Sequence, residues 1–135
     1  MDALAAANTD TPVGELIAEI SSPVIVKGRR HRSLQPWGGD ALLLKTIAQG
    51  DWLTNGFRNR DLRQQFYRPS ELESKDRRRQ ASAAISRTLA LLKAHRLIQK
   101  VSGSHRYQVT ARGRQITAAI LNVHHLSVEQ VLKVA

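Results

Sequence analysis

Three consecutive arginines, Arg77, Arg78 and Arg79, form the longest uninterrupted run of charge of one sign in this sequence. A guanidinium group stays charged at physiological pH and can bind a phosphate group through two parallel hydrogen bonds. Duplex DNA presents a dense line of such phosphates, so we expect these three side chains to contact DNA. The alternative is that Glu73 and Asp76, which are their neighbours in the chain, pair with them on an ordinary charged surface.

Further basic and hydroxyl side chains extend this predicted contact surface. Arginines on a short predicted helix would position the protein along the DNA backbone, and serines on a longer helix would let it approach the base edges. A short predicted hairpin offers one or two more phosphate contacts. The residues that we expect to contact DNA are Arg58, Arg60, Arg63, Arg77, Arg78, Arg79, Ser82, Ser86, Arg87, Lys100, Ser104 and Arg106. A separate basic run from Lys27 to Arg32 fits equally well a basic arm that reaches an adjacent groove and a solvated linker.

The positive charge of the chain is concentrated in one block. The 135 residues have a formal net charge of +10, and residues 54–114 hold fifteen bases against four acids. A surface that serves only solubility mixes both signs, which this block does not. We therefore favour a face in this block that binds a polyanion.

The sequence also argues against several other kinds of chemistry. It has no cysteine, which rules out disulfides, thiol catalysis and cysteine-ligated metal sites. His124 and His125 are adjacent and would point about 100° apart on a helix, so we expect no metal site there. The chain has no phosphate-binding loop, dinucleotide-binding or zinc-protease motif, and its acids lie among arginines. We therefore expect neither an enzyme nor a cofactor.

Two features bear on localisation. No apolar run approaches the roughly 18 residues that a membrane-spanning helix needs, so we expect no membrane span. The first ten residues include acids and lack the basic start of a secretory signal. We expect a cytoplasmic protein.

Apolar spacing and turn residues predict the elements in the first half of the chain. A short helix is expected over 12–20 and an edge strand over 24–26, with a domain boundary that separates residues 1–36 from 37–135. Asp40 is the expected N-cap of a helix that ends before Gly50, and residues 52–54 are expected to be extended. Asn59 is the expected N-cap of a second helix over 59–66.

A long helix, a hairpin and C-terminal helices are predicted after that. A capping box from Ser70 to Glu73 predicts the start of a helix over about 73–95. Its buried stripe is expected to contain Ala81, Ile85, Thr88 and Leu92, and its opposite face Arg79, Ala83, Ser86 and Ala90. Strands over 97–101 and 105–109 form the hairpin, and Thr110 caps the next helix. Ser127 and Gln130 form a capping box that predicts a separate last helix.

This order of elements resembles a winged helix-turn-helix domain. Residues 91–98 and the stretch from Arg106 to Arg114, with its Tyr107, Thr110 and Gly113, are similar to the end of the recognition helix, the wing and the start of the next helix in MarR- and ArsR-like regulators. The resemblance covers about residues 40–125. It implies a mainly α fold with a small β-hairpin wing at 97–109 and a recognition helix, about 73–95, that enters the major groove of DNA.

One departure from these families concerns the exit from the long helix. His95 and Arg96 stand where those regulators often place a glycine, so a residue other than glycine must provide the left-handed exit. The stretch from Asn55 to Leu62 and the cluster from Arg77 to Arg79 also resemble the C-terminal part of longer, uncharacterised bacterial proteins.

The sequence therefore predicts a module that binds double-stranded DNA, in transcriptional regulation or in recognition of DNA by a mobile element. A homodimer through the apolar faces of residues 12–20 and 127–135 is expected. Two alternatives stay open. The domain could bind RNA, although few aromatic residues are available to stack on single-stranded bases. It could also be a protein-interaction winged helix whose positive face meets an acidic partner.

Overall fold

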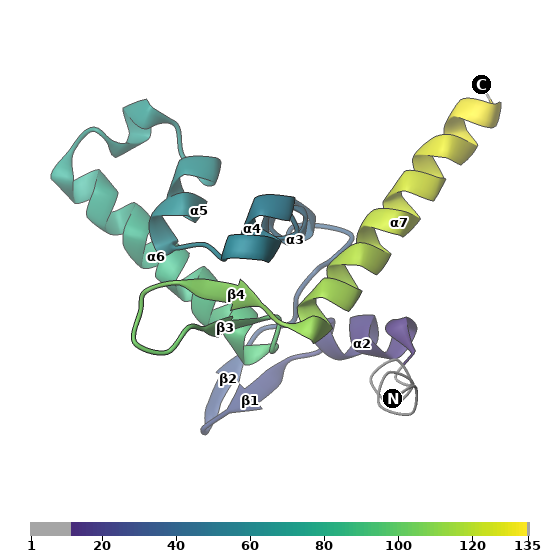
Figure 1. The fold of residues 1–135 in the computed structure, drawn as a ribbon, viewed down its shortest axis with the longest axis horizontal. Coiled ribbons are helices and arrows are strands. Elements are labelled where there is room, and N and C mark those ends of the chain that lie inside the picture. Colours follow the sequence, from purple (N-terminus) through teal and green to yellow (C-terminus); the bar gives the residue numbers. More distant parts are fainter. Residues whose placement is uncertain (1–11, 135) are drawn as a thin grey trace.

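The computed structural model describes residues 12–134, and it describes the side chains of these residues except for Val13 and those beyond Val123. Over this range the chain is mainly helical with a small antiparallel hairpin at 98–109, as the sequence predicts for its coarse fold class (Figure 1). A second antiparallel hairpin, at 24–31, was not predicted, because the sequence suggested only its first strand. The elements in chain order are α2 (Val13–Ile20), β1 (Val24–Val26), β2 (Arg29–His31), α3 (Ala41–Ile47), α4 (Gly50–Asn55), α5 (Asn59–Phe66), η1 (Pro69–Leu72), α6 (Lys75–Ala94), β3 (Ile98–Lys100), β4 (Tyr107–Val109) and α7 (Ala111–Val134).

One hydrophobic cluster joins these elements, and α6 lies along it. The predicted buried stripe of the long helix is confirmed at Ala81, Ile85 and Leu92, whereas Thr88 is only half-buried. The same cluster includes Leu16 and Leu34, which come from the segment before residue 37. The boundary at residues 36–37 stays a prediction, but the core packs across it.

One of the two surfaces that the sequence suggests for dimerisation belongs to α2. Helix α2 packs against α7, and its Leu16 and Ile20 are buried in the core. These two side chains are therefore not free to meet a second copy, and the expected dimer face at 12–20 is wrong. The other expected face, 127–135, lies outside the described side chains, so the homodimer stays a prediction.

Two predictions about the region before α5 are wrong. Residues 52–54 belong to α4 and are not extended. The preceding helix does end before Gly50, at Ile47, as expected, but Gly50 itself begins α4. Aromatic packing explains the helix, because Trp52 stacks on Phe57 with ring centroids 4.9 Å apart. The N-cap of α5 is Arg58, not Asn59, and its backbone N–H donates to the carboxylate of Asp61 at 2.7 Å.

The start of α6 and the course of α7 also differ from the prediction. Pro69 begins a short 3-10 helix, and the N-cap of α6 is therefore Ser74, four residues after the Ser70 that the capping box suggested. The hydroxyl of Ser74 accepts from the N–H of Arg77 at 3.1 Å. The hydroxyl of Thr110 caps α7 by accepting from the N–H of Gly113 at 3.0 Å, as predicted. Helix α7 then continues through Ser127 without a break, because no proline or glycine follows Gly113 to end it.

No helix in the described part of the chain has the length and apolar content needed to cross a lipid bilayer.

Candidate nucleic-acid interface

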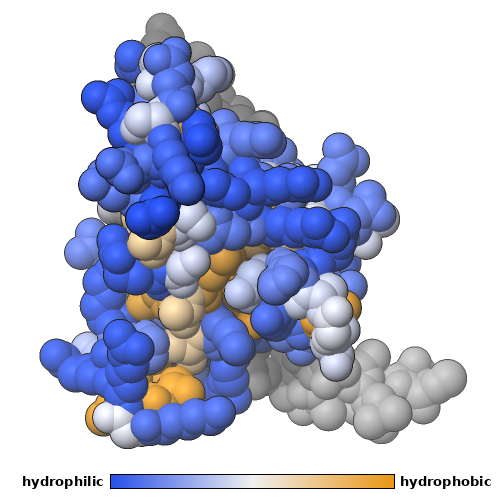
Figure 2. All heavy atoms as spheres, turned by 90° about the vertical axis from the view of Figure 1, so that its left-hand side faces the viewer, coloured by the Kyte–Doolittle hydropathy of each residue, from blue (hydrophilic) through white to orange (hydrophobic). Residues whose placement is uncertain are grey.

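The outer face of α6 carries small and basic side chains and is open to solvent. Arg79, Ala83, Ser86 and Ala90 are all exposed, as the helical periodicity predicts. A helix whose exposed face is built from short side chains can bring its backbone close to a partner surface. Figure 2 shows that this side of the molecule is mostly hydrophilic, with hydrophobic patches near the centre and at the lower left of the view.

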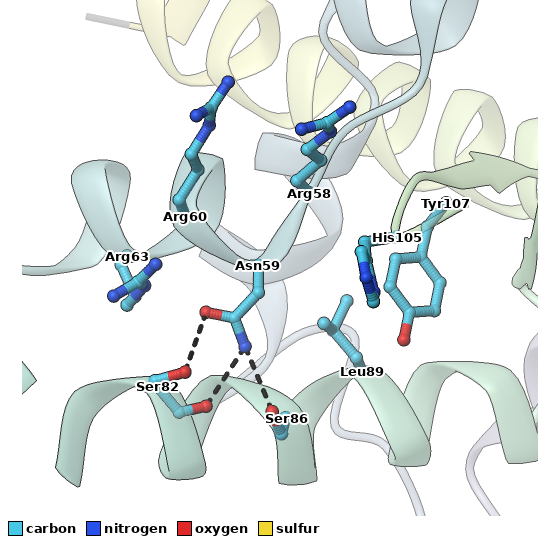
Figure 3. A pocket seen from close by; sticks show the side chains of 9 residues that line it. All are labelled: Arg58, Asn59, Arg60, Arg63, Ser82, Ser86, Leu89, His105 and Tyr107. Carbon is cyan, nitrogen blue, oxygen red and sulfur yellow. Dashed lines mark hydrogen bonds between the residues drawn. The ribbon is translucent and has the colours of Figure 1, made fainter. Parts of the chain in front are cut away.

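Asn59, which the sequence predicts as the N-cap of α5, instead joins this helix to the outer face of α6. The amide nitrogen of Asn59 donates to the carbonyl oxygen of Ser82 and to the hydroxyl oxygen of Ser86, both at 3.1 Å. Figure 3 shows Asn59 pointing from α5 to α6, while Arg58 and Arg60 extend away from that contact. Asn59 therefore fixes the two helices relative to each other. The hydroxyl of Ser86 still has its own proton to donate to a ligand.

Arginines of α5 border a basin beside α6. The basin has a volume of about 360 Å³. Its lining residues are Arg58, Asn59, Arg60, Arg63, Ser82, Ser86, Leu89, His105 and Tyr107, and none of them is acidic (Figure 3). The Nε atoms of Arg58 and Arg63 are buried and have no hydrogen-bond partner, which is costly for a cationic group. An anion in the basin would offer acceptors to such guanidinium groups.

The β3–β4 hairpin is held beside this basin by backbone and aromatic contacts. Phe57 and Tyr107 form a bridge in which each N–H donates to the other's carbonyl, at 2.9 and 2.7 Å. Gly56 precedes this bridge with φ +77°, and a Cβ at this position would lie 2.5 Å from the carbonyl oxygen of Tyr107. Only glycine therefore lets the hairpin come this close.

The hairpin residues expected to contact DNA divide into two groups. The hydroxyl of Ser104 donates to the carbonyl of Val101 and shapes the hairpin itself. The guanidinium of Arg106 donates to the carbonyl of Asn55 at 2.8 Å and attaches the hairpin to α4. Lys100 is exposed and forms no side-chain hydrogen bond. Neighbouring His105 is exposed as well and was not in the predicted contact set.

The arginine run at the start of α6 is exposed and does not pair with the nearby acids. Neither Glu73 nor Asp76 forms an ion pair with Arg77, Arg78 or Arg79; the only ion pairs among the described side chains join other residues. The guanidinium of Arg78 instead donates to the carbonyl oxygens of Leu72 and Glu73, at 3.0 and 2.9 Å, and so holds η1 against α6. Arg77 and Arg79 keep their guanidinium groups free for an external partner.

A second basic basin lies on α6 next to the β1–β2 hairpin. It has a volume of about 440 Å³ and is lined by Arg29, Arg30, His31, Arg32, Ser86, Arg87, Ala90 and Leu91, again without an acid. The basic run was expected to be an arm or a linker, and the structure shows it as strand β2 with its preceding turn. Arg87, a predicted contact residue, is exposed and lies in this second basin.

Two side chains tie the end of this hairpin to the body of the molecule. Arg32 donates to both carboxylate oxygens of Asp40, at 2.9 and 3.0 Å, and the pKa of Asp40 is lowered chiefly by this hydrogen bonding. The Nε2 atom of His95, at the end of α6, lies 2.8 Å from the carbonyl oxygen of Arg32. Burial lowers the pKa of His95, which keeps its ring neutral and suited to donate this bond.

The described side chains contain no group of three or more histidines or carboxylates close enough to hold a metal ion. The side chains of His124 and His125 lie outside that set.

A comparison with known proteins gives no relative from which a function could be transferred: no protein-family model, no curated protein and no solved structure matches this chain.

Proposed function

We propose that this protein binds double-stranded DNA through the exposed face of α6, in the manner of a winged helix-turn-helix domain. Helix α5 and α6 would be the helix-turn-helix pair, with α6 in the major groove, and the β3–β4 hairpin would be the wing. The observation that carries the proposal is that arginines surround this face without carboxylate partners. Arg58, Arg60, Arg63 and Arg87 line the two basins, and Arg77 and Arg79 begin the helix.

Charge without internal compensation favours an external anion as the partner. An arginine that serves only solubility normally has an acid near it on the same surface. Neighbouring cations without such acids repel one another and destabilise the folded state. A phosphate backbone removes that repulsion and releases condensed counterions. The short side chains at the centre of the face, Ala83, Ser86 and Ala90, would lie nearest to the base edges.

The contacts divide into three roles on this proposal. The α5 arginines and Lys100 would fix the position of the protein on the backbone and carry no sequence information. Arg79, Ser86 and Arg87 face outward from α6 and would read the groove. The third role is to hold the contact surface in shape. It would belong to Ser82, Ser104 and Arg106, because each already forms a hydrogen bond within the chain.

The experiment is a fluorescence-anisotropy titration of labelled random-sequence duplex DNA at 50 and 200 mM salt. Six phosphate contacts predict a loss of roughly three decades in affinity over that range. Arg79→Glu should weaken binding at low salt by roughly ten-fold or more. The control is Lys45→Glu, which changes the charge equally at an exposed position of α3 and should leave the affinity within about two-fold.

The same titration separates the alternatives. Duplex RNA, single-stranded DNA and polyglutamate serve as competing ligands under identical salt conditions. Tighter binding to RNA, or equal binding to polyglutamate and duplex DNA, would contradict the proposal. Absence of binding to duplex DNA at 50 mM salt would contradict it as well.

A further inference from the structure

The β1–β2 hairpin places a second set of cations along α6, on a side that the proposed helix-turn-helix and wing do not cover. The basin next to it and the basin next to α5 share only Ser86. On α6 the first basin is lined by Ser82 and Leu89 besides Ser86, and the second by Arg87, Ala90 and Leu91. At about 100° of rotation per residue, these two sets are centred roughly a quarter-turn or more apart around the helix. The two basins therefore flank the exposed face of α6.

The position of the hairpin is fixed by the fold, so its cations are presented at a defined place. Its two-residue loop, Lys27 and Gly28, has φ of +51° and +79°, the positive values that tight two-residue hairpin loops require. At its other end, the N–H of Leu34 donates to the carbonyl oxygen of Ile20 at 2.7 Å, and Leu34 itself is buried. The contacts of Arg32 with Asp40 and His95 add two further attachments. A flexible linker has none of these features.

The charges of the hairpin are directed to an external partner. Arg29 and Arg30 are exposed, have no acidic partner and form no side-chain hydrogen bond. They lie in the same basin as Arg87 of α6, and no carboxylate lines that basin. Three arginines that line one basin without an acid offer a site for a phosphate-bearing ligand.

We propose that the β1–β2 hairpin is a second phosphate-binding arm, which contacts the DNA backbone across the exposed face of α6 from α5 and the β3–β4 hairpin. This inference rests on the proposed function. A helix in the major groove has a phosphate backbone on each side of it, about 12 Å apart across the groove. The α5 arginines would bind one of these strands, and Arg29 and Arg30 would bind the other.

The first test measures how many phosphates the hairpin neutralises. The double variant Arg29→Ala/Arg30→Ala is titrated with random-sequence duplex DNA over a range of salt concentrations. Loss of two phosphate contacts should make the slope of log affinity against log salt shallower by about 1.8, and the variant should lose roughly ten-fold less affinity than the wild type between 50 and 200 mM salt. Lys45→Glu, which removes the same two units of charge on α3, should keep the wild-type slope.

The second test places the hairpin next to the DNA, and it uses the absence of cysteine from the chain. Ile25 pairs with Arg30 in the hairpin and is 69% exposed, so Ile25→Cys can carry a photo-reactive benzophenone. Leu42 on α3 is 62% exposed and provides the matched control, Leu42→Cys. Cross-linking to labelled duplex DNA should be efficient from position 25 and at background level from position 42.

The outcomes separate this inference from the function on which it rests. If the wild type binds DNA and Arg79→Glu weakens binding, but the double variant keeps the wild-type slope, the hairpin is not a phosphate-binding arm and the proposed function stands. Cross-linking from position 25 that does not exceed that from position 42 also overturns the inference. If the wild type does not bind duplex DNA, both proposals fall together. Thermal unfolding of each variant verifies that the fold is intact, as the exposure of the substituted side chains leads us to expect.

Discussion

Substitution of Asp40 by asparagine should loosen the attachment of the β1–β2 hairpin to the body of the molecule. The carboxylate of Asp40 is almost fully buried and accepts three hydrogen bonds, two from Arg32 and one from the backbone N–H of Gln35 at 2.7 Å. Asparagine keeps the size of the side chain but loses the charge. Its amide group also turns one acceptor into a donor that would face another donor.

The structure allows the size of the effect to be worked out. A hydrogen bond to a charged group contributes about 1.5–3 kcal/mol when it is shielded from solvent. The side chain of Arg32 is 59% exposed, so solvent screening reduces its contribution to roughly 1 kcal/mol. Together with a weakened bond from Gln35, Asp40→Asn should lower the free energy of unfolding by about 1–2 kcal/mol at pH 7. For a chain of this length that corresponds to a fall in Tm of roughly 4–8 °C.

The loss should depend on pH in a defined direction. Hydrogen bonding to Arg32 is the main reason that the pKa of Asp40 lies below its ordinary value of 3.8. A carboxyl group whose pKa is lowered in the folded state contributes stability above its unfolded pKa and loses it as the pH falls through the folded pKa. The difference between wild type and Asp40→Asn should therefore be constant from pH 7 down to about pH 5 and shrink below it.

Urea unfolding followed by circular dichroism at pH 7, 5, 4 and 3 measures this difference. Arg30→Ala is the control, since Arg30 is exposed without an acidic partner and should change stability by less than about 0.5 kcal/mol. A double-mutant cycle of Asp40→Asn with Arg32→Ala should give a coupling energy of about 1 kcal/mol. A difference that is as large at pH 3 as at pH 7, or a coupling energy of zero, would refute the reasoning.

Three further predictions concern single residues, and the same unfolding assay measures all of them. Arg96 has φ +61° at the exit of α6, a conformation that costs an L-residue about 1–2 kcal/mol. After subtraction of the greater freedom of an unfolded glycine, Arg96→Gly should raise the free energy of unfolding by roughly 0.5–1 kcal/mol. A loss of stability would contradict this. A Cβ on Gly113 would lie 2.3 Å from the carbonyl oxygen of Leu97, so Gly113→Ala should lower stability by about 1–3 kcal/mol, and an unchanged urea midpoint would show that α7 can move away freely. Burial lowers the pKa of His95 below 6.5. As the pH falls through the pKa of histidine in the unfolded chain, the unfolded state takes up the proton first, and the free energy of unfolding decreases. The wild type should therefore lose more stability than His95→Gln between pH 7.5 and pH 5.5, and parallel pH profiles of the two proteins would disprove the assignment.

Periodicity along a single element was sufficient to predict much of this fold. The buried and exposed faces of α6 follow from residues spaced three and four apart, because 3.6 residues per turn place them on one side of the helix. The pairing of β3 with β4 follows from alternation on both sides of a short turn that contains Gly103. The left-handed exit at Arg96 was expected from the missing glycine, and the N–H of Leu97 indeed reaches back to the carbonyl of Leu92 at 3.0 Å.

Errors arose where contacts with residues outside an element decide its conformation. Residues 50–55 contain a glycine and a β-branched residue, yet they form a helix because Trp52 packs on Phe57. Asn59 has the composition of an N-cap, but its amide is used to join α5 to α6 across 23 positions of sequence. Local propensities are worth only tenths of a kcal/mol per residue, and such tertiary contacts outweigh them.

The candidate site shows the same division. The number of arginines, their concentration in residues 54–114 and the lack of catalytic motifs are properties of the sequence, and they alone indicate an anionic partner. Which arginines are free is a property of the folded chain. Arg78 and Arg106 bind backbone carbonyls, whereas Arg79 is exposed and its side chain forms no hydrogen bond or ion pair within the described part of the chain. The carbonyl oxygen that accepts from each of these arginines is known only from the folded structure, because the spacing of residues in the sequence does not predict it.

The position of the basic run from Lys27 to Arg32 depended entirely on tertiary structure. Its composition fitted an arm and a linker equally well, because charge density is the same in both. The buried carboxylate of Asp40 and the ring of His95, which is 63 positions away from Arg32, hold it as a hairpin beside α6. The sequence determined that this protein carries an excess of cations, and the packing of its core determined that two groups of them flank the same helix face.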